Sequence, residues 1–108
     1  TLPDGEVAIE RSRWRLDDLP PGFALAGSRR PADGGADAEH LVVSDGLVSV
    51  SVYVERRTEN SPESDIAMSR GVLSVYTRIA DPWRITALGN VPKETIEKIA
   101  LSVDAAAP

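Results

Sequence analysis

The sequence contains no cysteine, and this absence excludes disulfide bonds and thiolate metal sites. It also lacks any apolar run near the roughly 20 residues that a membrane-spanning helix needs, and it shows no secretory leader. We therefore expect no direct insertion of this chain into a membrane. Thr1 is not a natural initiator, so we expect the chain to have been processed or cut from a longer protein.

Basic residues are fewer than acidic residues, 12 against 17, which gives a formal net charge of −5 at pH 7. This balance argues against a nucleic acid or an anionic membrane surface as the main partner. The charge is also uneven, because residues 31–69 carry eight acidic residues against Arg56 and Arg57. The basic residues are mostly arginines, whose planar guanidinium groups suit carboxylates and are enriched at interfaces. They indicate either a solvated strand face or a recognition patch.

Aromatic residues are few: two tryptophans, two tyrosines and one phenylalanine. A domain with five aromatic side chains needs most of them for burial. We therefore expect Trp14, Phe23 and Trp83 to belong to the core rather than to a ligand platform.

The clearest pattern is a strand hairpin between Glu39 and Arg56. Valines occupy every second position from 48 to 54, and polar side chains fill the positions between them. Successive side chains of a strand point to opposite faces, so the valines line one face and the polar groups the other. Asp45-Gly46 lies between this run and the apolar residues 41–43, which is a strong signal for a tight turn.

Further alternating runs predict six strands in all, followed by one helix. Pro92 suits a helix start, and Ile96, Ile99, Ala100 and Val103 form one apolar stripe. The predicted fold is α+β: a single antiparallel sheet of about five to six strands with one C-terminal helix packed on one face. We expect one domain over residues 1–108, with frayed ends at 1–6 and 104–108 and a mobile segment at 57–69. The predicted strands cover residues 7–16, 23–28, 39–44, 47–56, 72–79 and 83–88.

No catalytic, cofactor or metal motif stands out. His40, Ser44 and Asp45 suggest a hydrolase constellation, but all three belong to one exposed hairpin, with no oxyanion-binding nest implied. Asp17-Asp18 sits before a Pro-Pro turn, where acidic residues usually cap backbone donors. A cation site from Asp33, Asp37 and Glu39 lacks the spacing of a calcium loop. We predict no enzyme activity, no cofactor and no metal.

Several short motifs follow one another in a fixed order. They are Trp14, LPPGF at 19–23, HLVVSDGLVSVSVYVE at 40–55, GV at 71–72 and GNVPKETIEKIALSV at 89–103. In this order and spacing they resemble the C-terminal domain of the MucB/RseB family, whose members are periplasmic regulators of the envelope stress sigma factor, sigma-E. The resemblance runs from about residue 14 to 103. The family's large N-terminal lipid-carrier-like domain has no counterpart here, so ligand sensing by that domain is not carried over.

The resemblance implies a role in protein recognition and not a reaction. Members of the family bind the periplasmic segment of a membrane-spanning anti-sigma factor and shield it from the protease that starts its degradation. The C-terminal domain is expected to supply much of this contact. By resemblance we expect a periplasmic location, the anti-sigma factor as partner, and the N-terminal lipid-carrier-like domain as a neighbour in the full-length protein.

We expect the contact on the polar face and at the end of the 47–56 strand, and in the segment that follows. The edge of a sheet can accept a partner's peptide, and an exposed edge could equally pair two copies of the chain. The alternative function is a small-ligand or lipid-sensing domain of a cell-envelope protein, which requires an apolar pocket between helix and sheet. The predicted partner-binding residues are Ser49, Ser51, Tyr53, Arg56 and Arg57.

Overall fold

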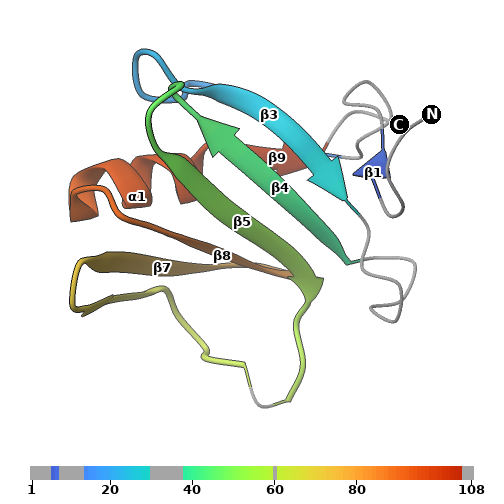
Figure 1. Cartoon of the computed structure of the whole chain (residues 1–108). Coiled ribbons are helices and arrows are strands. Elements are labelled where there is room, and N and C mark those ends of the chain that lie inside the picture. The colour runs from blue at the N-terminus through green and yellow to red at the C-terminus, as the bar shows by residue number, and fades with distance from the viewer. Residues whose placement is uncertain (1–5, 8–13, 30–37, 60, 106–108) are drawn as a thin grey trace.

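The computed structural model describes residues 6–7, 14–29, 38–59 and 61–105. It confirms the α+β class, with an antiparallel sheet and a helix near the C-terminus. Figure 1 shows this helix running across one side of the sheet. The elements are β1 (Glu6–Val7), β2 (Trp14–Leu16), β3 (Ala24–Arg29), β4 (Glu39–Ser44), β5 (Ser49–Arg56), β6 (Ile66–Arg70), β7 (Leu73–Ala80), β8 (Trp83–Gly89), α1 (Lys93–Leu101) and β9 (Val103–Ala105).

The main sheet has the strand order β1-β3-β4-β5-β8-β7-β6, and every pair in it is antiparallel. Six of its strands have five residues or more, and β1 adds a two-residue edge. A separate two-stranded sheet joins β2 to β9. Within the described residues, no helix is long and apolar enough to cross a membrane.

The β4–β5 hairpin forms as predicted. Asp45 closes its turn, since its Oδ1 atom accepts hydrogen bonds at 2.9 Å from the backbone N–H groups of Leu47 and Val48. These two bonds lower the pKa of the Asp45 carboxyl. Gly46 has φ of +96°, a conformation that glycine adopts without a steric penalty. The hairpin thereby fixes the register in which the valines of β5 face inward.

The core lies between the inward face of the main sheet and α1. The predicted helix stripe is confirmed for Ile96, Ile99 and Ala100, which are buried against the sheet. Trp14 is also buried, at 5% exposure, and meets the half-buried Trp83 edge-to-face with ring centroids 4.9 Å apart. Three valines of β5 are fully buried in the same core: Val50, Val52 and Val54.

The two ends of the chain differ from the prediction. The single strand expected over residues 7–16 is wrong, because β1 joins the main sheet and β2 joins the second sheet; residues 8–13 lie outside the described part. The helix ends at Leu101, so the buried Val103 belongs to β9 instead of the helix stripe. Of the ends expected to fray, Glu6 lies in β1 and 104–105 lie in β9, paired with β2. Such pairing depends on distant residues, which local periodicity does not report.

A further strand was missed in the segment 57–69. Ile66 to Ser69 belong to β6, which pairs with β7 through a tight turn at Gly71, where φ is +60°. All five side chains of β6 are exposed. The strand therefore lacks the alternation of buried and exposed positions on which its prediction would have depended.

Candidate binding surface

The main sheet has one face turned toward α1 and an opposite face, which we call the outer face. Strand alternation places Ser49, Ser51 and Tyr53 of β5 there, because the valines between them are buried on the α1 side. Tyr53 is 38% exposed, Ser49 is exposed and Ser51 is half-buried. Three of the five predicted residues therefore share one accessible face.

Tyr53 is held in place by stacking on His40 of β4. The two rings are nearly parallel, with an interplanar angle of 7° and centroids 4.4 Å apart. They meet because His40 and Tyr53 are directly paired in the β4–β5 register. Burial lowers the pKa of His40, and the positive charge of Arg29, its neighbour on β3, lowers it further. The stack therefore presents Tyr53 as a rigid aromatic surface over a neutral imidazole.

An apolar row crosses the outer face beside this stack. We use the name apolar row for five side chains placed in register on successive strands. Ser51 is the polar member, and the other four are aliphatic or thioether side chains. Ser51 lies two residues from Tyr53, and the row places Val42 on one side of it and Leu88, Val75 and Met68 on the other. Its members are Val42, Ser51, Leu88, Val75 and Met68.

Arg56 and Arg57 do not lie with Tyr53. Arg56 occupies an even position like the buried valines, and its guanidinium carbon lies 5.0 Å from the ring centroid of Trp83. Arg57 follows the end of β5 and forms an ion pair of 2.8 Å with Asp81. The predicted residues thus divide into an outer-face group and an arginine pair at the end of the strand.

Sequence reasoning missed the part of the outer face contributed by β6 and β7. Ile66 and Met68 are 40% and 55% exposed, and Leu73 is 39% exposed. The strand predicted over residues 72–79 was available as a signal for β7. No such signal existed for β6, because its side chains are uniformly exposed and 57–69 was interpreted as a mobile segment.

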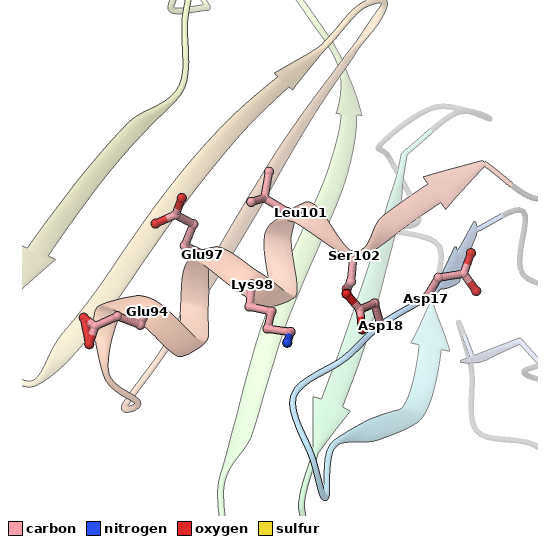
Figure 2. Close-up of a pocket in the computed structure, with 7 residues that line it drawn as sticks. All are labelled: Asp17, Asp18, Glu94, Glu97, Lys98, Leu101 and Ser102. Atoms are coloured by element: carbon pink, nitrogen blue, oxygen red, sulfur yellow. The ribbon is translucent and has the colours of Figure 1, made fainter.

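A cleft of about 340 Å³ lies between α1 and the loop after β2. In Figure 2, Asp17 and Asp18 lie on this loop opposite the C-terminal half of the helix, and Glu97 projects from the far side of the helix. Asp17 already pairs with Arg15 at 3.2 Å. Among the described residues, no group of three or more acidic or histidine side chains is arranged to hold a metal ion. The remaining lining residues are Glu94, Lys98, Leu101 and Ser102.

The suggested His40, Ser44 and Asp45 constellation is not assembled. His40 and Ser44 stand at opposite ends of β4, about 13 Å apart at the usual rise of a strand. Ser44 Oγ accepts the N–H of Gly46 at 2.9 Å, so it and Asp45 are both engaged within the turn. Of the three suggested cation ligands, Glu39 is buried and accepts a hydrogen bond from Ser28 Oγ at 3.0 Å; the other two lie outside the described residues.

These features define a class: a small α+β domain whose antiparallel sheet is covered by a helix on one face and offers an aromatic and apolar surface on the other. The chain belongs to the family described as the MucB/RseB C-terminal domain, whose model matches residues 8–104. The resemblance drawn from the sequence is thereby confirmed.

Curated relatives are regulatory proteins. The sigma-E factor regulatory protein RseB of Salmonella typhimurium is 36% identical over 106 residues, and RseB of Escherichia coli K12 is 35% identical; both alignments cover 95% of this chain. The sigma factor AlgU regulatory protein MucB of Pseudomonas aeruginosa is 33% identical and covers 93%. The chain spans about a third of these relatives, 32% of each.

Solved structures agree with the fold. A crystal structure of MucB in complex with MucA(peri) superposes with a TM-score of 0.73 and 31% identity, and covers 90% of this chain and 38% of that one. A structure of the Pseudomonas aeruginosa MucA/MucB complex gives a TM-score of 0.72 with 30% identity over the same 90% of this chain and 36% of that one. Both neighbours therefore come from complexes of MucB with MucA.

Proposed function

We propose that this chain is a non-catalytic interaction module of a negative regulator of the sigma-E-type envelope stress response. It binds the periplasmic segment of a membrane anti-sigma factor in the periplasm and protects that segment from proteolysis. The names of the relatives and the MucB complexes with MucA(peri) support this partner class. In this proposal the chain acts next to an N-terminal lipid-carrier-like domain of the full-length protein.

The observation that carries the proposal is the outer face around Tyr53. Its ring is exposed and its position is fixed by His40, so a partner would bind it at little cost in side-chain entropy. The hydroxyls of Ser49 and Ser51 can pair with a peptide backbone, and the adjoining apolar row can bury its aliphatic side chains. Exposed tyrosines with apolar neighbours are frequent binding hot spots.

Arg56 and Arg57 would contribute from the end of β5. Arg57 is engaged with Asp81, and Arg56 rests on Trp83, so both guanidinium groups are positioned by the fold. They would meet acidic groups of a peptide that passes from the outer face around the strand end. In this arrangement Tyr53 supplies buried contact area and the arginines supply charge.

The alternative, a lipid-sensing domain, gains no support from the cleft in Figure 2. Four of its seven lining residues are carboxylates, and such a lining disfavours an acyl chain.

Separate substitutions of Tyr53 and Arg56 test the proposed surface. We expect Tyr53→Ser to weaken binding of the anti-sigma periplasmic segment at least tenfold, about 1.4 kcal/mol, because the stacked ring loses its contact area. Arg56→Gln should weaken binding less and make it less dependent on salt. Both affinities are measured by calorimetric titration.

The matched control is Leu101→Ser, which removes an apolar side chain of similar exposure, 50%, from α1 on the opposite side of the sheet. Its affinity should equal that of the unmodified chain, and all three variants should remain folded, as circular dichroism would show. Unchanged affinity in both Tyr53→Ser and Arg56→Gln would reject this placement of the contact.

A further inference from the structure

The single histidine of the chain, His40, lies within the proposed contact surface. Its imidazole is half-buried and stacks on the exposed ring of Tyr53. The strand register places both rings in one line of outer-face residues, from Arg29 on β3 through His40 and Tyr53 to Thr86 on β8. A partner that binds over the Tyr53 ring therefore also takes the neighbouring imidazole out of water.

The surroundings of His40 suit a neutral imidazole better than a charged one. A neutral imidazole has one N–H group, whereas an imidazolium has two, and each needs an acceptor. In the described part of the chain, the Nε2 atom of His40 is buried and has no hydrogen-bond partner. Protonation would therefore put a charged N–H group where no acceptor stands, which costs more than leaving a neutral nitrogen there.

Arg29 adds a positive charge beside the imidazole. In the strand register, the residues directly beside His40 are Arg29 on β3 and Tyr53 on β5, and Arg29 is exposed. Burial of the ring is the larger cause that lowers the pKa of His40, and the charge of Arg29 is the second. The imidazole is therefore neutral near pH 7 and takes up its proton only in a more acidic solution than an ordinary histidine does.

Two carboxylates near the imidazole are engaged elsewhere. Glu55, the next outer-face residue of β5, accepts a hydrogen bond from Arg84 at 3.0 Å. Glu39 points to the α1 side, where it is buried. On β1, Glu6 is the register partner of Arg29 and stands two strands away from the imidazole. Among the described residues, the charged group directly beside the imidazole is therefore the guanidinium of Arg29.

We propose that His40 makes binding at the outer face depend on pH: the partner binds over a neutral imidazole, and protonation of His40 weakens the contact. A partner that covers the Tyr53–His40 stack removes water from the imidazole, and this disfavours the charged form further. The pKa of His40 is then lower in the complex than in the free chain. The affinity is therefore full above the pKa of the free chain and falls as the pH drops through it, because binding must release a proton. This inference rests on the proposed function, since it concerns the same surface and the same partner.

The free chain provides the first test, because NMR can follow its single histidine without assignment of others. We expect the imidazole resonances to titrate with a midpoint below about pH 6.5, and the ring resonances of Tyr53 to shift with the same midpoint. Arg29→Gln should raise this midpoint, since it removes the positive charge beside the imidazole. The matched control is Arg70→Gln on the distant strand β6, which should leave the midpoint unchanged. A midpoint at or above about pH 6.5 in the unmodified chain would overturn the proposal.

The second test measures binding of the anti-sigma periplasmic segment by calorimetry at about pH 7.5 and about pH 5. We expect the dissociation constant of the unmodified chain to be at least about threefold larger at the lower pH. His40→Phe keeps an aromatic ring beside Tyr53 but carries no proton, so the ratio of its two dissociation constants should be close to one after the same correction for groups that titrate on the segment. Circular dichroism checks that both chains are folded at both pH values.

The two ways in which this test can fail are distinct. If the segment binds but the ratio is the same for the unmodified chain and His40→Phe, the role of His40 is overturned and the proposed function stands. If the segment does not bind at either pH, both are overturned.

Discussion

At the scale of single residues, the close packing of β5 against β8 depends on Gly89. A Cβ atom at this position would lie 2.9 Å from Val50 Cγ2 and 3.3 Å from the backbone oxygen of Ser49. Val50 is fully buried, so it has little freedom to move away. The absence of a side chain at position 89 is therefore a packing requirement of the fold.

We predict that Gly89→Ala destabilises the domain by about 1–3 kcal/mol, the usual cost of overpacking a core. Gly27→Ala is the matched control, since Gly27 also lies in a strand but a Cβ atom added there would meet no other atom within 4 Å. The control should be neutral or stabilise by about 0.5 kcal/mol or more, because it restricts the unfolded chain. Denaturant midpoints measure both variants; equal midpoints would contradict this account of Gly89.

The five residues predicted to bind a partner were only partly placed correctly by strand parity. Strand parity correctly placed Ser49, Ser51 and Tyr53 on one face. It also puts Arg56 on the valine side, where the structure finds it over Trp83. Parity alone could thus have separated Arg56 from Tyr53, whereas the stacking of Tyr53 on His40 depends on the exact β4–β5 register.

At the scale of elements, Arg78 links β7 to the end of α1. Its Nη1 atom donates to the backbone oxygens of Val103 at 2.8 Å, Ala100 at 3.2 Å and Leu101 at 3.4 Å. The last carbonyls of a helix lack intrahelical partners and carry partial negative charge. One arginine thereby satisfies the end of α1 and holds the start of β9 beside the main sheet.

Replacing Arg78 by Met should therefore loosen this end of the helix. We predict a loss of about 1.5–3 kcal/mol in the free energy of unfolding, because charge-assisted hydrogen bonds to partly buried carbonyls are lost. Arg70→Met is the comparison, since Arg70 is exposed at the end of β6, and it should change stability by about 0.5 kcal/mol or less. If chemical denaturation finds the two variants equally stable, the link does not hold the helix.

Elements could be predicted where burial repeats regularly. The valines of β5 and the stripe of α1 show the periods of a strand and a helix, and both elements were found. β6 was missed because its side chains are uniformly exposed, and its pairing comes from the backbone and the turn at Gly71. β9 was missed because its partner, β2, lies about 90 residues away in the sequence.

At the scale of the whole molecule, the sheet separates the core from the proposed binding surface. The face toward α1, the helix seen along one side of the sheet in Figure 1, holds the core. On the outer face, Tyr53 and Met68 are exposed. Composition and periodicity predicted this two-sided arrangement. The joining of Val42, Leu88, Val75 and Met68 into one row could not be predicted, because it requires the strand order β4-β5-β8-β7-β6.

The central claim is that this domain by itself recognises the anti-sigma segment. Calorimetric titration of the unmodified chain with the periplasmic segment of the anti-sigma factor from the same genome tests this claim most directly. We predict saturable binding of one segment per chain with a dissociation constant in the micromolar range or tighter, about −8 kcal/mol or stronger. No heat of binding at any practical concentration would contradict the claim and show that this domain alone does not form the contact.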